Sequence, residues 1–386
     1  MTTYNRLHVA FESGNGAWLT DTKGDRYLDA LSGISVCSLG HANPAITAAL
    51  SDQAQRLIHT SNLYRIPLQE QLADRLCEIS GLDKVFFGNS GAEANEAAIK
   101  ICRKYAHERG VGDPVIVVMD GSFHGRTIAT LTATGNQKVK NGFGPLLDGF
   151  HHVRYGDSGS LRALTNLNIN IVAVMLEPIL GEGGIVIPPA GYLRDVAELC
   201  RENDWLLVLD EIQTGMCRTG KWFGFQHEQI KPDVITLAKA LGNGVPVGAC
   251  IANDRTAAPM IAGSHGSTFG GNHLASRAGL AVIEFMETHD IPSRVTDLGH
   301  RMLEGFRAGL RDVAGIRDIR GRGLMMAIEL EKDCTELPGL ALERRLLINV
   351  TAGNVVRLLP PLIISDEEGE QIVEAVTGLI QNFLCA

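Results

Sequence analysis

The chain has 386 residues, of which 45% are hydrophobic and 20% are charged; this size and composition are typical of a soluble globular protein and predict two domains. The net charge of −9 argues against a surface that binds nucleic acid. No run of about 18 apolar residues occurs, so we expect no membrane span.

The eight cysteines lie singly, and none of them forms a CxxC pair. This spacing favours neither a zinc site nor a disulfide framework, so no metal centre is expected. The N-terminus also lacks the charged start and apolar stretch of a signal peptide. We therefore expect a protein of the reducing cytoplasm.

The order of the predicted elements indicates an α/β fold. Strand-like runs occur at residues 115–119, 171–176, 205–209, 234–238 and 247–252, with helical patterns such as 192–202 between them. Strands buried on both faces, with helices between them, favour an open and mainly parallel sheet. Amphipathic stretches at 273–287 and 292–313, strands at 323–330 and 355–359, and a helix from about Asp366 then predict a smaller α+β domain. We assign residues 46–271 to the large domain, and residues 1–45 with residues 272–386 to the small domain.

A turn of small residues at 88–93 leads directly into a helix predicted from Ala94 to about His107. Exposed N–H groups and the dipole at a helix start favour an anion, and Ser90 adds a hydroxyl donor. The alternative is an ordinary capped helix with Ser90 or Asn89 as its cap.

Two loops that follow predicted strands carry groups suited to binding a flat, charged ligand. In the first, Phe123 offers a ring for stacking and Arg126 a guanidinium for a carboxylate; the alternative is a surface loop anchored by a buried Phe. The second is the glycine-rich turn at 181–184, where Glu182 either is solvated or faces an arginine.

Asp210 and Lys239 each end a strand-like run, which is where open α/β sheets bind ligands. A carboxylate there can hold a protonated heterocyclic nitrogen. A lysine in apolar surroundings has a lowered pKa and can act as an amine nucleophile. These are the two groups that pyridoxal phosphate (PLP) requires, although many sheets end strands in Asp or Lys for structural reasons alone. Gln213, close behind Asp210, is placed to donate to a ring oxygen beside that nitrogen.

Two further features lie nearer the C-terminus. The turn at 266–272, with Ser267 and Thr268, opens a helix and is a second candidate phosphate contact. Arg357 is a lone charge in an apolar strand, so it needs an anionic partner from the protein or a ligand.

These blocks, in this order and spacing, resemble the class-III (subgroup II, ω-type) PLP-dependent aminotransferases over the whole chain. The matching stretches are residues 33–41, 89–95, 122–127, 210–215, 237–241, 267–272 and 349–362. The resemblance implies the fold-type I PLP-transferase fold, with a large PLP-binding domain and a small domain. It also implies a homodimer as the functional unit.

The resemblance also implies roles for the residues around the cofactor. Lys239 is expected to be the Schiff-base lysine and the group that moves the substrate proton. Asp210 would pair with the pyridinium nitrogen, Gln213 would contact the phenolic oxygen, and Phe123 would stack on the ring. The phosphate contacts would be Gly91 and Ala92, with Ser90 as a further contact and Thr268 from the neighbouring subunit.

For the substrates, the resemblance implies that Arg126 holds a carboxylate and that Ser267 lies nearby. Arg357 would take the α-carboxylate of 2-oxoglutarate or glutamate. Glu182 would cover Arg357 while the other substrate is bound, so that one site serves a terminal amine and a dicarboxylate in turn.

Within the family, the chain is most similar to the enzymes that transfer the δ-amino group of N2-acetyl-L-ornithine to 2-oxoglutarate in arginine biosynthesis. Ornithine, succinylornithine, N-succinyl-diaminopimelate and 4-aminobutyrate are alternative substrates; Arg126 favours those with a free α-carboxylate. A semialdehyde aminomutase is a further alternative, against which Glu182 and Arg357 argue.

Two readings outside this family are disfavoured by the residues. No GxGxxG follows a predicted strand, which argues against a nicotinamide dehydrogenase. A catalytically dead protein would be expected to have lost Lys239 or Asp210. The sequence departs from the usual family pattern at Cys37, where Asn is frequent, at Asn243, where Gly is common, and at His273. Of these, only Cys37 lies in a segment expected to shape the substrate entrance.

Overall fold

The computed structural model describes residues 1–385, and its largest element is a seven-stranded sheet in the order β4-β10-β9-β8-β7-β5-β6. β10 runs antiparallel to both of its neighbours, and the pairs from β9 to β6 are parallel. The strands are β4 (Lys84–Gly88), β5 (Val115–Met119), β6 (Phe150–Val153), β7 (Ile171–Leu176), β8 (Leu206–Asp210), β9 (Val234–Leu237) and β10 (Gly248–Ala252). The α/β fold with a mainly parallel sheet is confirmed.

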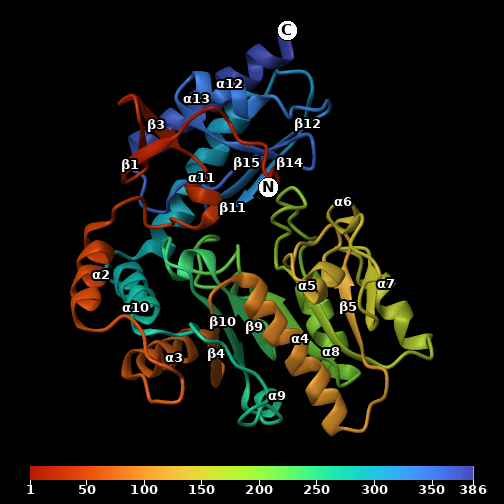
Figure 1. Ribbon diagram of the computed structural model, residues 1–386. Coiled ribbons are helices and arrows are strands. Elements are labelled where there is room, and N and C mark those ends of the chain that lie inside the picture. The colour runs from red at the N-terminus through yellow and green to blue at the C-terminus, as the bar shows by residue number, and fades with distance from the viewer. Residues whose placement is uncertain (386) are drawn as a thin grey trace.

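Helices cover both faces of this sheet (Figure 1). Val208 and alternate residues of its neighbours pack with α4 (Gly91–Glu108), whereas Leu207 and Leu209 pack on the other face with α8 (Tyr192–Glu202). Successive residues of a strand point to opposite faces, so an all-apolar run is buried on both sides. Short helices complete the layers: α5 (Ile128–Ala133), α6 (Gln137–Lys140), α7 (Ser158–Ala163) and α9 (Asp254–Ala257).

The two ends of the chain form two smaller sheets, and the first of these joins N-terminal and C-terminal strands. The N-terminal strands β1 (Phe11–Asn15), β2 (Trp18–Asp21) and β3 (Arg26–Asp29) form a meander, and β3 pairs in parallel with β13 (Leu346–Leu347). The second sheet has the order β11-β12-β15-β14, with β11 (Ile316–Arg322), β12 (Met325–Leu330), β14 (Asn349–Thr351) and β15 (Val355–Leu358). Its helices are α11 (Ile291–Gly309), α12 (Leu337–Glu343) and α13 (Asp366–Cys385).

Helix α10 (His273–Thr288) packs against α2 (Pro44–Arg56) and α3 (Pro67–Ser80) beside the large sheet (Figure 1). The domain boundaries at residues 45 and 271 stay predictions. No helix among the described residues is long and apolar enough to cross a membrane.

Several element boundaries differ from the sequence-based expectation. Helix α4 begins at Gly91 rather than Ala94, because the Ser90 side chain accepts a hydrogen bond from the N–H of Glu93 and caps the helix there. The helix predicted at 292–313 ends at Gly309. The predicted strand at 247–252 is antiparallel in the sheet, and β4 and the N-terminal strands were not predicted at all.

Candidate active site

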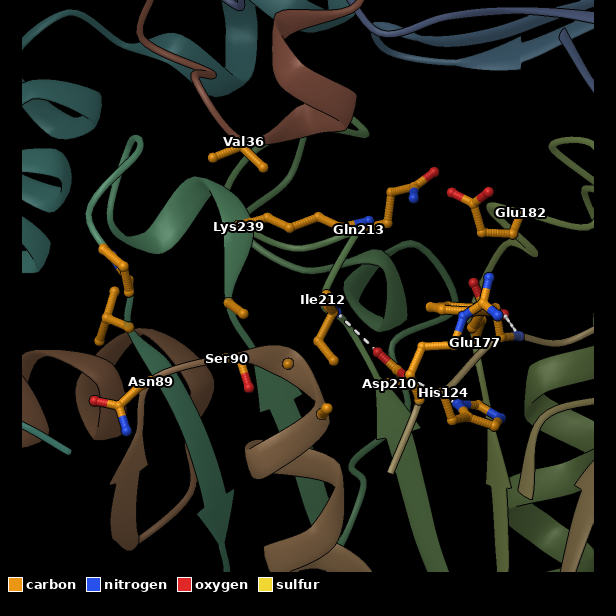
Figure 2. A pocket seen from close by; sticks show the side chains of 18 of the residues that line it. Val36, Asn89, Ser90, His124, Glu177, Glu182, Asp210, Ile212, Gln213 and Lys239 are labelled. Atoms are coloured by element: carbon orange, nitrogen blue, oxygen red, sulfur yellow. Dashed lines mark hydrogen bonds and ion pairs between the residues drawn. The ribbon is translucent and has the colours of Figure 1, made fainter. Parts of the chain in front are cut away.

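A cavity of about 450 Å³ lies at the carboxyl ends of β8 and β9, against the start of α4 (Figure 2). Parallel strands place side chains from distant parts of the chain at this edge. The cavity collects most of the residues predicted from the sequence, namely Ser90, Gly91, Ala92, Phe123, Arg126, Glu182, Asp210, Gln213 and Lys239. Arg357, Ser267 and Thr268 are not among the residues that line it.

The Asp210 carboxylate is buried at the end of β8 and is held by Asn95, His124 and the backbone of Ile212. Its Oδ2 atom accepts a hydrogen bond from Asn95 Nδ2 at 2.8 Å and lies 2.8 Å from His124 Nδ1, and Oδ1 accepts from the N–H of Ile212 at 3.1 Å. Thr236 Oγ1 donates to Asn95 Oδ1 at 2.7 Å, which fixes the orientation of that amide. No arginine or lysine neutralises the carboxylate by direct contact within residues 1–385, so its charge is available to a cationic ligand atom.

Lys239 begins the short 3₁₀ turn η3 (Lys239–Leu241) directly after β9, and its backbone has a φ of 44°. Such a conformation is unfavourable for a residue with a side chain. Burial lowers the pKa of the Lys239 amine to about 8, although the nearby Glu182 carboxylate acts in the opposite direction. About a tenth of the amine is then neutral at pH 7, compared with far less for an exposed lysine, and the neutral form is the one that a nucleophile or proton acceptor requires.

The start of α4 forms an anion-binding corner of the cavity. The first N–H groups of a helix, here those of Gly91 and Ala92, have no acceptor inside the helix. A Cβ atom on Gly91 would lie 2.7 Å from Cδ1 of Ile212, so a larger residue here would require the Ile212 side chain to shift. Ser90 both caps the helix, 3.2 Å from the N–H of Glu93, and lines the cavity, so the two alternatives weighed for it are compatible.

Phe123, Ile212 and Gln213 give the cavity its walls. The Phe123 loop is fixed by Glu177, whose two carboxylate oxygens accept from the N–H of Phe123 and the N–H of Gly181, each at 2.9 Å. Burial raises the pKa of Glu177 to about 7, and the nearby Asp210 charge acts in the same direction. The Oε1 atom of Gln213 is buried and has no protein partner among the described residues.

Glu182 connects the cavity to Arg357. The Nη1 atom of Arg357 lies 2.6 Å from Oε1 of Glu182, and its Nε donates to Asn349 Oδ1 at 3.1 Å. Burial alone would raise the pKa of the Glu182 carboxyl, but the charge and hydrogen bond of Arg357 lower it below its usual range. The anionic partner that a buried arginine requires is thus a residue on the cavity wall.

The 267–270 turn and Arg126 complete the surroundings. Asn89, which lines the cavity, donates to Ser267 Oγ at 3.2 Å, whereas Thr268 is exposed at the surface. The exposed Arg126 guanidinium lies 5.6 Å from the centre of the Phe123 ring. In a single chain, then, Thr268 is separate from the cavity.

Sequence reasoning missed Asn95, His124, Glu177 and Ile212. Asn95 and His124 carry no signal, because their partner Asp210 is 115 and 86 residues away in the sequence. Glu177 at the end of β7 follows the strand-end pattern that identified Asp210, and that pattern was the available signal.

The residues present fit PLP. The cavity combines a buried carboxylate for a ring nitrogen, an amine of lowered pKa for the aldehyde carbon, and helix N–H groups for a phosphate. The Oε1 atom of Gln213 on the cavity wall is buried and has no hydrogen-bond partner among the described residues, which is consistent with a polar ligand in the cavity.

Residues 2–380 match the model of the aminotransferase class-III family. The chain therefore belongs to the class-III aminotransferases, which are PLP-dependent enzymes, and the predicted family and cofactor are confirmed.

Known proteins of related sequence and structure agree with this family. The acetylornithine aminotransferase of Nitrosomonas europaea is 52% identical over 384 residues, which cover 100% of this chain and 98% of that protein. A structure of the ornithine aminotransferase from Toxoplasma gondii, described with partial occupancy of PLP at its active site, has a TM-score of 0.94 and 35% identity, covering 99% of this chain and 92% of that one. The N-acetylornithine aminotransferase of Stenotrophomonas maltophilia K279a has a TM-score of 0.85 and 35% identity, covering 99% and 98%.

Proposed function

We propose that this protein transfers the δ-amino group of N2-acetyl-L-ornithine to 2-oxoglutarate, giving N-acetyl-L-glutamate 5-semialdehyde and L-glutamate. The observation that carries the proposal is that Lys239, Asp210 and Glu182 line one cavity, and that Glu182 pairs with the buried Arg357 behind it. An acetylornithine aminotransferase that is 52% identical over 98% of its length supports this donor.

When bound, PLP withdraws electrons from the carbon that carries the amino group, so that this carbon can lose a proton. The residues of the chain would hold it as follows. Asp210, oriented by Asn95 and His124, would keep the ring nitrogen protonated, and Gln213 would contact the phenolic oxygen. Phe123 and Ile212, which line the cavity, would pack against the ring.

The phosphate and the proton transfer involve other residues. The N–H groups of Gly91 and Ala92 would bind the phosphate, with Ser90 beside them. Lys239 Nζ, neutral in part because burial lowers its pKa to about 8, takes the proton from the substrate carbon and returns it.

The two substrates differ in the groups that they present near Arg357. Acetylornithine enters with its terminal amine, and the Glu182 carboxylate then covers the guanidinium at 2.6 Å. 2-Oxoglutarate and glutamate enter with an α-carboxylate beside the reacting carbon. This carboxylate displaces Glu182 and pairs with Arg357. Arg126, exposed at the cavity mouth, holds the far carboxylate, with Ser267 close by.

We further infer a homodimer. The turn that carries Thr268 lies beside exposed apolar side chains, with Leu63 87%, Tyr64 70% and Phe269 59% exposed. Asn62 Nδ2 donates to the carbonyls of Ser267 and Gly270 at 3.2 and 3.1 Å, so the two loops form one surface. A second copy of the chain would bury this surface and bring Thr268 to the partner's phosphate site. A cytoplasmic location accords with the single free cysteines.

Product analysis tests the function. The protein is mixed with PLP, N2-acetyl-L-ornithine and 2-oxoglutarate, and L-glutamate formation is measured. We expect glutamate and semialdehyde in equal amounts, and none when 2-oxoglutarate is omitted. A rearranged amine that forms without 2-oxoglutarate would instead identify an aminomutase.

A further inference from the structure

The segment before the cavity contains a strained turn. Ser32, Gly33, Ile34 and Ser35 have φ values of 48°, 63°, 63° and 61°. Left-handed backbone is unfavourable for residues that have a Cβ atom, and consecutive residues of this kind are rare. We call residues 31–40 the entrance turn. Strain of this sort persists only where surrounding contacts determine the conformation.

Buried contacts hold the first half of the entrance turn. The Asp29 carboxylate accepts from the N–H groups of Leu31 and Ser32, each at 2.8 Å, and Ser32 Oγ donates to the Leu359 carbonyl at 2.7 Å. Arg218, which is fully buried, donates to the hydroxyls of Ser35 and Ser38, each at 3.0 Å. These contacts fix the residues on either side of Val36.

Asn243 holds the second half from the opposite direction. It lies in the loop that follows Lys239, and its Oδ1 accepts from the N–H of Leu39 at 2.8 Å while its Nδ2 donates to the Gly40 carbonyl at 3.1 Å. Asn243 also has a φ of 46°, a conformation that glycine adopts without strain. Glycine would adopt this backbone conformation with less strain than asparagine. The asparagine side chain, however, makes two hydrogen bonds to the entrance turn that glycine cannot make.

The turn presents Val36 to the cavity. Val36 lines it, and Figure 2 shows its side chain on the Lys239 side of the site. Gly244 lines the same part of the cavity, and a Cβ atom there would lie 3.7 Å from the Cys37 sulfur. The loop after Lys239 and the entrance turn thus line the same part of the cavity and are joined by the two hydrogen bonds of Asn243.

We propose that Asn243 and Arg218 are positioning residues, which hold the entrance turn so that Val36 packs against the methylene chain of the amino donor. This inference rests on the proposed function, because it takes the donor to be an ω-amine with an aliphatic chain. The effect on catalysis passes through Val36, since neither Asn243 nor Arg218 lines the cavity.

The test begins with Asn243→Gly, which removes both hydrogen bonds and also relieves the left-handed backbone. We expect the KM for the donor to rise about fivefold with kcat changed by less than about twofold, because the lost contact affects substrate binding more than the chemical step. PLP affinity, the PLP absorbance spectrum and the thermal midpoint should remain as in the wild type. The matched control is Gln229→Gly, which relieves a φ of 55° at an exposed site and should leave KM unchanged.

A double-mutant cycle separates positioning from a general structural role. Val36→Ala alone should raise KM, and Asn243→Gly should add little to it in the Val36→Ala background. Ser38→Ala, which removes one acceptor of Arg218, should behave like Asn243→Gly. Additive effects of Val36→Ala and Asn243→Gly, or a Val36→Ala variant with an unchanged KM, would overturn the proposal.

The same double-mutant cycle distinguishes an error in the proposed donor from an error in the proposed role of Asn243. If the wild-type protein uses another ω-amine in place of acetylornithine, the cycle is measured with that amine, and coupling between positions 36 and 243 still decides the proposal. If only L-glutamate reacts, the proposal fails together with the function, because no aliphatic ω-amine donor then exists.

Discussion

In the proposed mechanism, the exchange between two unlike substrates depends on Glu182. Its contact with Arg357, at 2.6 Å, keeps a fully buried guanidinium neutralised when no substrate carboxylate is present.

The Glu182→Ala variant tests this exchange. With the guanidinium uncovered, kcat/KM for L-glutamate relative to acetylornithine should rise about tenfold, because glutamate no longer displaces an internal carboxylate. Half-reaction kinetics with each donor alone give the ratio. Glu198→Ala, which removes an exposed carboxylate paired with Arg201, serves as the control. An unchanged ratio in the Glu182 variant would contradict the exchange mechanism.

Lys239 offers a second test at the residue scale. The neutral amine is the reactive form, and burial lowers its pKa from 10.5 to about 8. The rate at which the PLP-free protein binds PLP covalently should therefore increase with pH and level off above about 8. Stopped-flow absorbance measures this rate. A rate that continued to rise up to pH 10.5 would show that the amine is not desolvated.

Whether a site residue could be predicted depends on whether its role is marked in the local sequence. Asp210 and Lys239 end buried strands, so local sequence identified them, and most of the residues assigned to the cofactor line the cavity with them. Asn95 and His124 act only through Asp210 and gave no local signal. Their individual roles remain predictions until variants are measured.

At the scale of elements, the N-terminal meander is tied to the entrance turn by the Asp29–His41 pair. His41 Nε2 lies 2.7 Å from Asp29 Oδ2, the same carboxylate that accepts from the N–H groups of Leu31 and Ser32. Burial alone would lower the pKa of His41, but hydrogen bonds to the Asp29 carboxylate and the Cys37 thiol raise it to about 9.

This pair predicts a pH-dependent stability. A folded-state pKa raised from 6.5 to about 9 contributes stability that is fully present below pH 6.5 and is lost as the pH rises through about 9. The thermal midpoint of the wild type should therefore decline across this window relative to that of His41→Gln, and the two curves should converge above it. Parallel curves from pH 6 to 10 would contradict the pairing.

The elements that sequence patterns predicted well are those with strong local signals. The all-apolar β7 and the strongly amphipathic α8 were predicted at their observed bounds. The antiparallel direction of β10 and the pairing of β3 with β13 depend on contacts between distant segments. Periodicity alone does not encode the direction or the partner of a strand.

At the scale of the whole molecule, the exposed position of Thr268 and the apolar side chains beside it predict a site shared between two subunits. Lys239→Ala and Thr268→Glu should each inactivate the protein, the first by removing the amine and the second by repelling the phosphate.

Mixing the two variants through reversible dissociation should restore roughly a quarter of the wild-type activity, because about half of the dimers are hybrids and each hybrid has one intact site. Size-exclusion chromatography confirms the exchange of subunits, and each variant carried through the same treatment alone is the control. Hybrids without activity would show that Thr268 serves the site of its own chain.

The most direct test of the account is the visible spectrum of the PLP-loaded protein during each half-reaction. Adding N2-acetyl-L-ornithine without 2-oxoglutarate should abolish the absorbance band of the lysine-bound cofactor, and adding 2-oxoglutarate afterwards should restore it. A protein that PLP does not colour would contradict the cofactor site built on Lys239 and Asp210. A coloured protein that acetylornithine does not bleach would contradict the proposed donor.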